Sequence, residues 1–272
     1  MRILFCGDVV GRAGRKVLLE RLPGLRAELA LDAVIVNGEN AAAGFGITPA
    51  ICQDFFAAGA DLITTGNHVF DQREILPLLD REPRLIRPLN MMPGTPGRGS
   101  AELRLVDGRK LVVTQVIGRL FMGPYDDPFR ALEAELAKYA LGATAHAIVV
   151  DLHAEATSEK MALAHLADGR ASAAIGTHTH VPTADAWIMP GGTAYVTDVG
   201  MTGDYDSVIG MDKTVSLQRF RSHVPGARNA PALGEATLCA VYLEIDDRSG
   251  LARVIEPLRL GARLVPAMPR NI

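Results

Sequence analysis

Seven candidate metal-binding side chains follow predicted strand ends between Asp8 and His180 of this 272-residue chain. Each comes at or just after the end of a short apolar run, where a strand is expected to finish. The set has two carboxylates, two amides, three imidazoles and no thiolate, and consists of Asp8, Glu39, Asn40, Asn67, His153, His178 and His180. Such mixed oxygen and nitrogen ligands favour iron, manganese or zinc over magnesium and calcium, which prefer oxygen alone.

The number of these side chains favours two metal ions over one. A single catalytic zinc uses three protein ligands and a water, so seven residues are too many for it. Two ions about 3.5–4 Å apart, bridged by a carboxylate and a hydroxide, would use such a set and would hold the attacking and leaving oxygens of a phosphoryl transfer. Glu39 is central in the set and is the predicted bridge.

Each residue taken alone also has a structural explanation. Asp8 fits a turn or a helix cap equally well, and Asn67-His68 after a glycine is common in turns. Five polar strand ends in one chain are harder to explain by chance. His178 and His180 are two positions apart, so on an extended segment both imidazoles are expected to approach one centre.

The N-terminal part of the chain repeats a strand, a polar loop and a helix three times. The predicted strands are Arg2–Cys6, Ala33–Val36 and Asp61–Thr64. The predicted helices are Arg15–Ala30, a helix from Thr48-Pro49 to Gly59, and a short helix that Asp71 caps. Such units imply a largely parallel, buried sheet. Because the carboxyl ends of parallel strands meet at one edge, the polar residues that follow them are expected to share one site.

The rest of the chain adds antiparallel strands. Pro88–Gly99 is a predicted loop, and a hairpin is expected from Ala101–Val106 and Lys110–Ile117. The further predicted elements are a helix Pro128–Ala140 capped by Asp127, a strand His146–Asp151 leading to His153, a helix Ser158–Asp168, a strand Ala171–Ile175, and short strands near Ala186, Ala194, Leu238 and Val254. We therefore predict an α/β fold over residues 1–272, a single domain in which helices flank a sandwich of two mixed β-sheets.

Composition excludes several classes of protein. A net charge of -3 gives no field that would attract polymeric nucleic acid or an anionic membrane. Three scattered cysteines argue against a disulfide framework and a cysteine zinc site. The N-terminal apolar run is too short for a signal peptide, and no apolar segment approaches the roughly 20 residues of a membrane span. The expectation is a cytoplasmic protein with a small-molecule substrate and no membrane, while a homo-oligomer stays open.

The glycines after the first strand do not indicate a dinucleotide site. Gly7, Gly11 and Gly14 have the spacing G-x-x-x-G-x-x-G, which differs from the G-x-G-x-x-G of such sites. They are expected to let the backbone approach a metal-bound phosphate. Arg12 is a candidate substrate contact in the same loop, and the loops Pro88–Gly99 and Met201–Gly210 are further candidates.

Five motifs in a fixed order carry a resemblance to a known family. They are Gly7-Asp8, Asn37-Gly38-Glu39-Asn40, Gly66-Asn67-His68, the single His153, and Gly176-Thr177-His178-Thr179-His180. Together they resemble the calcineurin-like metallophosphoesterase superfamily, and within it the bacterial YmdB-like branch. The superfamily's first motif, Asp-x-His, reads Asp8-Val9-Val10 here, so one histidine ligand is absent. Its usual Gly-Asp reads Gly38-Glu39-Asn40, and the YmdB-like branch shows both changes.

The resemblance implies a fold, a site and a reaction. The fold would be the metallophosphoesterase sandwich, and the cofactors two divalent transition-metal ions, iron or manganese with zinc as the alternative. The implied ligands are Asp8, Glu39, Asn40 and His180 for the first ion, and Glu39, Asn67, His153 and His178 for the second. A metal-bridging hydroxide would be the nucleophile, and His68 the general acid. The implied substrates are phosphodiesters, with 2′,3′-cyclic nucleotides opened to 3′-nucleotides.

Two other functions remain compatible with the same residues. A metal-bound hydroxide is not selective by itself, so the site could serve a bimetallic hydrolase of non-phosphate esters. The protein could also be a metal-dependent regulatory or binding protein whose hydrolysis is slow. Inhibition by phosphate tests the first, and a variant of Glu39 that loses turnover tests the second.

Overall fold

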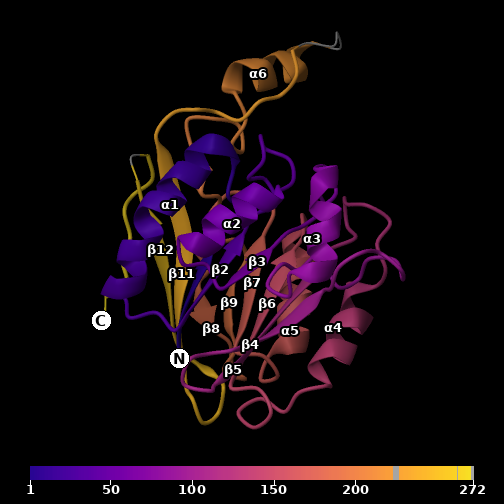
Figure 1. Cartoon of the computed structure of the whole chain (residues 1–272), viewed down its shortest axis with the longest axis vertical. Coiled ribbons are helices and arrows are strands. Elements are labelled where there is room, and N and C mark those ends of the chain that lie inside the picture. Colours follow the sequence, from indigo (N-terminus) through magenta and orange to yellow (C-terminus); the bar gives the residue numbers. More distant parts are fainter. Residues whose placement is uncertain (223–226, 262, 271–272) are drawn as a thin grey trace.

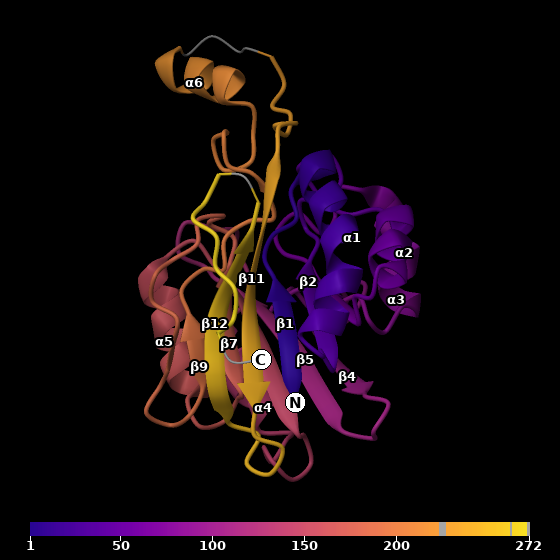
Figure 2. The same cartoon turned by 90° about the vertical axis from the view of Figure 1, so that its left-hand side faces the viewer.

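Two six-stranded sheets pack face to face, with helices on both outer sides (Figures 1 and 2). The computed structural model of the chain describes residues 1–222, 227–261 and 263–270. Apolar side chains of both sheets fill the space between them, among them Ile3, Phe5, Val113, Val149 and Ile175. The predicted α/β sandwich of two mixed sheets is confirmed.

The first sheet has the strand order β10-β11-β1-β2-β3, with β12 paired to β11. Strands β1, β2 and β3 run parallel, and β1 pairs antiparallel with β11. The elements of this half are β1 (Arg2–Cys6), α1 (Gly11–Glu28), β2 (Ala33–Asn37), α2 (Pro49–Ala57), β3 (Leu62–Thr64), η1 (Arg73–Ile75), α3 (Leu76–Arg81), β10 (Gly203–Asp204), β11 (Ala236–Ile245) and β12 (Ala252–Leu260). Alternate residues of β1 face the helices and the second sheet, so both faces of the strand are apolar and buried.

The second sheet has the order β4-β5-β6-β7-β9-β8. Strands β5, β6, β7 and β9 run parallel, and the predicted hairpin of β4 and β5 lies at one edge. The elements of this half are β4 (Ser100–Arg104), β5 (Lys110–Ile117), α4 (Pro128–Leu136), β6 (Ala147–His153), α5 (Thr157–Ala167), β7 (Ala173–Thr177), β8 (Trp187–Ile188) and β9 (Ala194–Val196). Helices α4 and α5 cover its outer face.

Most helix boundaries follow the expected capping chemistry. The side chain of Thr48 accepts a hydrogen bond from the Ile51 amide, and the carboxylate of Asp127 accepts two at the start of α4, as predicted. Helix α1 begins earlier than expected because Gly11, with φ +59°, turns the chain directly into it. The predicted cap at Asp71 is wrong: Gln72 precedes η1, and the Asp71 carboxylate bonds to His68 instead.

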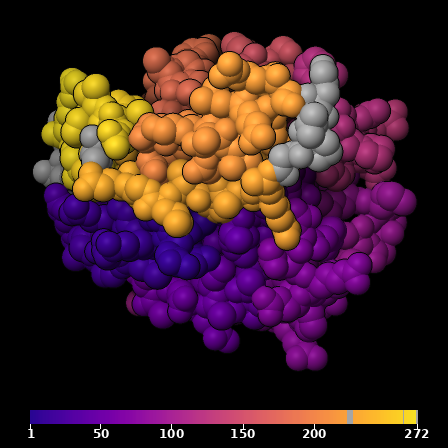
Figure 3. Space-filling model, turned by 90° about the horizontal axis from the view of Figure 1, so that it is seen from above, coloured from indigo at the N-terminus to yellow at the C-terminus, as the bar shows by residue number. Residues whose placement is uncertain are grey.

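Helix α6 (Lys213–Arg221) stands away from the two sheets (Figure 1). Among its residues, all of which are described, only Ser216 is buried. In the view from above, the orange segment that contains α6 lies across the end of the sandwich (Figure 3). No helix in the described part of the chain is long and apolar enough to cross a bilayer.

Candidate metal centre

The ends of parallel strands bring the predicted ligands to one edge of the sandwich. Strand β1 leads to Asp8, β2 to Glu39 and Asn40, and β3 to Asn67. In the facing sheet, His153 is the last residue of β6, and β7 leads to His178 and His180. Both sheets direct these ends the same way, so side chains from both halves of the chain meet.

Five of these residues form two groups that share Glu39. One group joins Glu39, His153 and His178, and the other joins Asp8, Glu39 and His180, with ligand atoms within 4.8 Å of one another in each group. Glu39 Oε1 lies 3.1 Å from His153 Nε2. Glu39 is 1% exposed, so its carboxylate lies between the two groups almost without contact with water.

Of the two predicted amides, Asn67 lies beside the first group and Asn40 directly follows Glu39 in the chain. Asn67 Oδ1 is 3.0 Å from His153 Nε2, which places it next to the first group. The amide nitrogen of Asn40 donates to the carbonyl of Gly44, which fixes the side chain and leaves its oxygen free to accept. The structure therefore brings all seven predicted residues to one end of the strands.

Three buried oxygens in this cluster have no hydrogen-bond donor assigned among the described residues, and one of them, on Glu39, has only the ion pair with His153. They are Asp8 Oδ1, Glu39 Oε1 and Asn40 Oδ1. A buried acceptor without a partner costs about 1–3 kcal/mol, so such atoms are rare in folded proteins. Cations would satisfy all three, and the carboxylate, amide and imidazole donors suit transition metals. The residues present thus fit a metal centre.

The acid–base properties of the cluster follow from close packing of opposite charges. Burial is the largest single influence on Glu39 and disfavours its charged form, but the charges and hydrogen bond of the surrounding histidines, His153 foremost, together outweigh it and lower the Glu39 pKa to about 2. Burial likewise opposes protonation of His153, yet Glu39 and then Asp8 raise its pKa to about 9. Burial and the charge of His153 lower the pKa of His178 to about 3. Without a metal, a proton on His153 offsets the carboxylates, and metal binding would displace it.

A chain of hydrogen bonds orients the ring of His153. Thr177 Oγ1 lies 2.9 Å from His153 Nδ1 and donates its proton to Asp151 Oδ1 at 2.7 Å. Because a hydroxyl has one proton to donate, Thr177 must accept from the Nδ1–H of the imidazole. Gln115 donates a further bond to Asp151 Oδ2. Nε2 of His153 therefore faces Glu39 and Asn67, and loss of its proton would free this nitrogen to bind a metal, an arrangement common around metal-binding imidazoles.

His68 lies at the rim of the cluster and outside both ligand groups. Its Nδ1 is 2.9 Å from Asp71 Oδ2, and its backbone amide donates to Glu39 Oε2 at 3.2 Å. The ring of Phe45 meets it edge to face, with 5.1 Å between ring centroids. Unlike the buried His153, His68 is partly exposed, so a substrate at the centre can reach it.

The expectation about the last two histidines is wrong in one respect. His178 and His180 have φ angles of 91° and 67°, so the segment is not extended. Both imidazoles still reach the same cluster, each in one of the two groups that share Glu39. The sequence also gave no sign of the supporting roles of Thr177 and Asp151, although Thr177 lies within the Gly-Thr-His-Thr-His motif.

The three predicted substrate contacts differ in whether they reach the metal cluster. Arg12 lines a separate cavity along α1, beside Lys16 and Glu20. The loop Met201–Gly210 does reach the cluster, since His180 Nδ1 donates to the carbonyl of Ile209 at 2.8 Å. In the loop Pro88–Gly99, the buried Asn90 donates to the carbonyls of Ile117 and Asp126 and so ties the loop after β5 in place.

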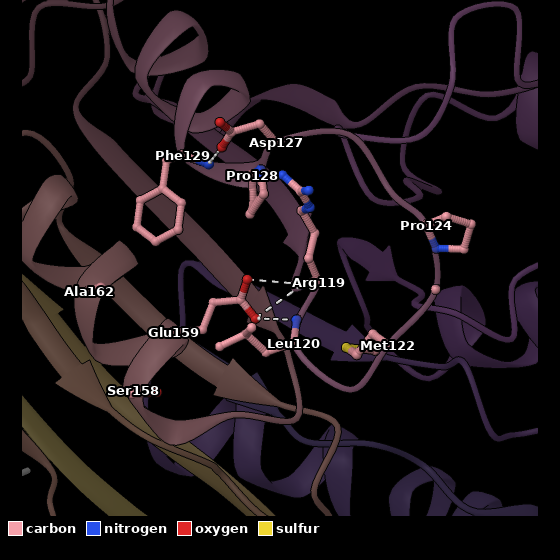
Figure 4. A pocket seen from close by; sticks show the side chains of 11 residues that line it. Arg119, Leu120, Met122, Pro124, Asp127, Pro128, Phe129, Ser158, Glu159 and Ala162 are labelled. Carbon is pink, nitrogen blue, oxygen red and sulfur yellow. Dashed lines mark hydrogen bonds between the residues drawn. The ribbon is translucent and has the colours of Figure 1, made fainter.

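A cavity of about 830 Å³ is lined by the loop that follows β5 and by helices α4 and α5 (Figure 4). Phe129, Met122 and Ala162 are among its lining residues, and Glu159 holds the loop by accepting hydrogen bonds from the amides of Arg119 and Leu120. None of the seven predicted ligands is among the described residues that line it. The metal cluster and this cavity are therefore separate features of the molecule.

Comparison with known proteins decides the family. The model of the family described as YmdB-like protein matches residues 4–258. The chain belongs to the YmdB-like family. This family is part of the metallophosphoesterase superfamily, so the resemblance carried by the five motifs is confirmed.

Relatives in the YmdB-like family cover almost the whole chain. The chain is 48% identical to a 2′,3′-cyclic-nucleotide 2′-phosphodiesterase of Bacillus subtilis over 94% of its length and 96% of the relative. It is 36% identical to a putative phosphatase/phosphodiesterase of Mycoplasma genitalium, over 96% of this chain and 93% of that one.

Two crystal structures share the architecture of this YmdB-like chain. A hypothetical protein from Thermus thermophilus superposes with a TM-score of 0.90 at 46% identity, over 96% of this chain and 99% of the other. A phosphatase from Mycoplasma pneumoniae superposes with a TM-score of 0.89 at 33% identity, over 96% and 93% of the two chains.

Proposed function

We propose that this chain is a metal-dependent phosphodiesterase that hydrolyses 2′,3′-cyclic nucleotides to 3′-nucleotides. The observation that carries the proposal is the buried carboxylate of Glu39, shared by two groups of candidate metal ligands at the strand ends. Membership of the YmdB-like family and the activity named for the Bacillus subtilis relative support the substrate class. We propose that residues 1–272 act as one domain, because ligands come from both sheets.

We propose that Asp8, Glu39, Asn40 and His180 hold one divalent ion, and that Glu39, Asn67, His153 and His178 hold the other. The three unpartnered buried oxygens support these assignments, because they belong to Asp8, Glu39 and Asn40. Iron or manganese suits the mixed donors, with zinc as the alternative. When bound, such a pair supplies an activated water and offsets charge on the phosphoryl oxygens.

His68 is the proposed general acid. Opening the cyclic phosphate at the 2′ oxygen produces an alkoxide, which needs a proton to leave. The Asp71 carboxylate accepts from Nδ1 of His68, so the protonated ring presents its Nε2 proton to the leaving oxygen. Because Asp71 fixes the ring by this bond, the proton has a defined direction of transfer.

A cytoplasmic location is part of the proposal. Cys6, Cys52 and Cys239 are buried free thiols in the described structure. Burial raises the pKa of all three thiols, to about 12 for Cys6 and Cys52 and about 11 for Cys239, so the reactive thiolate is disfavoured. Unpaired cysteines of this kind suit a reducing compartment.

Turnover of a defined substrate tests the activity. The protein loaded with Mn²⁺ or Fe²⁺ is expected to convert 2′,3′-cAMP to 3′-AMP, as resolved from 2′-AMP by chromatography, and EDTA is expected to stop the reaction. It should also cleave bis-p-nitrophenyl phosphate and be inhibited by inorganic phosphate. Hydrolysis of p-nitrophenyl acetate without hydrolysis of either phosphodiester would instead support a hydrolase of non-phosphate esters. No turnover of any of these substrates would support a metal-dependent regulatory or binding protein.

Replacing His68 by glutamine is expected to slow turnover of 2′,3′-cAMP much more than turnover of bis-p-nitrophenyl phosphate. For 2′,3′-cAMP, kcat should fall about 10²-fold because the leaving alkoxide loses its proton donor. For bis-p-nitrophenyl phosphate the fall should stay below about tenfold, since nitrophenolate leaves without a proton. Steady-state kinetics on both substrates measure the difference.

The exposed His165 on α5 provides the matched control. The same change to glutamine there should leave both rates unaltered. An equal loss on both substrates in the His68 variant would contradict the role of general acid and point to damage to the metal centre.

A further inference from the structure

A buried ion pair lies directly behind the histidine segment of the metal centre. Lys160 Nζ of α5 is 2.9 Å from Asp198 Oδ2, and both side chains are fully buried. Neither residue belongs to the two ligand groups. Removing two charges from water is costly, and a well-packed apolar pair often gives equal or greater stability. The pair therefore needs an explanation other than stability alone.

The contacts of Asp198 supply one. Its Oδ2 atom also accepts hydrogen bonds from the backbone amide of Thr179 at 3.0 Å and from the Thr179 hydroxyl at 2.7 Å. Its Oδ1 atom accepts from the amide of Gly200 at 2.8 Å. Thr179 is the residue between His178 and His180. The Asp198 carboxylate therefore binds the centre of the segment that carries both imidazoles.

This segment needs such support because its backbone is strained. His178 and His180 both have positive φ, a region that residues with a Cβ rarely occupy unless the surroundings enforce it. The His178 amide donates to Asp8 Oδ2 at 3.2 Å, while the next amide, that of Thr179, turns to Asp198. The alternation sends the two imidazoles into different ligand groups, as the predicted extended segment would not.

The neighbouring backbone fixes Asp198 in turn. The amide of Val199 donates to the carbonyl of Gly176, and the amide of Met201 donates to the carbonyl of His180. A side chain at Gly176 would collide with the carbonyl of Thr197, at 1.7 Å from an ideal Cβ. The two segments thus lie in direct contact, and Lys160 joins them to α5.

We propose that Lys160 and Asp198 are positioning residues that hold the segment Thr177–His180 in the form that divides its two imidazoles between the two metal ions. Asp198 binds the centre of the segment, and Lys160 pairs with the same carboxylate and so holds it against α5. The inference rests on the proposed function only in taking His178 and His180 as ligands.

Two substitutions test the proposal at different points. Lys160→Met keeps most of the length of the side chain and removes its charge, and Thr179→Val removes the hydroxyl that bonds to Asp198. Each should weaken binding of Mn²⁺ to the metal-free full-length protein by about 10–100-fold in at least one of the two sites, the usual effect of losing a residue that orients ligands. Isothermal titration gives the affinities, and the electron paramagnetic resonance of bound Mn²⁺ reports the geometry.

Two further variants serve as controls. Thr179→Ser keeps the hydroxyl and should bind Mn²⁺ as the wild type does. Leu163→Ala removes a buried side chain from the same helix, α5, without touching Asp198. It should lower the melting temperature and leave the Mn²⁺ affinity unchanged, which separates positioning from general loss of stability.

Imidazole signals of the metal-free protein provide a readout that does not depend on metal or turnover. In nitrogen–proton spectra the signals of His178 and His180 should shift in Lys160→Met and Thr179→Val and stay in place in Leu163→Ala. Unchanged signals with an Mn²⁺ affinity within twofold of wild type would overturn the proposal. If Lys160→Met does not fold, the comparison of Thr179→Val with Thr179→Ser tests the proposal. If wild type binds no metal, the proposed function fails, and the imidazole signals alone decide the positioning role.

Discussion

Replacing Glu39 by glutamine is expected to lower kcat/KM for 2′,3′-cAMP by at least about 10³-fold. The Glu39 carboxylate is the one member common to both ligand groups in the described structure, so no other side chain there links the two. Glutamine has nearly the same shape but presents one neutral oxygen where the carboxylate presents two charged ones. The variant should therefore hold fewer than two metal ions and lose the activated water that depends on them.

The loss should be visible in metal content as well as in rate. After loading with Mn²⁺ and removal of excess metal, elemental analysis should give two equivalents for wild type and at most one for Glu39→Gln. Glu133 offers the same chemical change at an exposed side chain that pairs with Arg170, and Glu133→Gln should retain both ions and full activity.

Other outcomes would redirect the interpretation. A Glu39→Gln protein that keeps two ions and wild-type kinetics would remove the shared carboxylate from the mechanism. A variant that is inactive and metal-poor, yet replaces the wild type in cells, would show that the cellular role depends on binding and not on hydrolysis. Circular dichroism establishes that the variant is folded in either case.

The positions of the candidate ligands along the chain were predictable because they depend on strand ends. Apolar runs that stop at Asp8, Glu39 or Asn67 predict parallel strands, and parallel strands predict a common edge. Side-chain contacts are not needed for this prediction. His153 lies at the same edge, because β6 runs parallel to its neighbours in the facing sheet.

The internal arrangement of the site was not predictable in the same way. The φ angles of His178 and His180 depend on hydrogen bonds to Asp8 and Asp198, which are distant in the sequence. Local sequence contains no such contacts, so the default expectation was an extended segment. Tertiary hydrogen bonds overrode it.

The same reasoning explains the error at Asp71. An aspartate before a short helix is a good cap by composition, and its carboxylate competes between the helix amides and other donors. Here an imidazole only three residues away offers the stronger partner, at 2.9 Å. Asp71, predicted as a helix cap, therefore forms a hydrogen bond with His68 instead. The sequence predicted His68 as the general acid but did not predict this partner.

Replacing Gly66 by alanine is expected to abolish metal binding and activity together. An ideal Cβ at this position would lie 2.0 Å from Glu39 Oε2 and 2.4 Å from His153 Nε2, both closer than real contacts allow. The backbone cannot easily retreat, because the amide and the carbonyl of the preceding Thr65 are both hydrogen-bonded to Gln115. Glu39 and His153 must move instead, so one methyl group displaces ligands from two strands of opposite sheets.

For Gly66→Ala we expect kcat/KM to fall by at least about 10³-fold. Overpacking should also lower the free energy of unfolding by about 1–3 kcal/mol. Gly24 is the matched control because it lies inside α1 and an added Cβ there meets nothing within 4 Å. Gly24→Ala should raise stability by about 0.5–1 kcal/mol and leave kinetics unchanged. Metal analysis and thermal unfolding of both variants measure these effects. Two bound ions and normal turnover in Gly66→Ala would contradict this prediction. They would show that the Glu39 carboxylate can be displaced without loss of the metal centre.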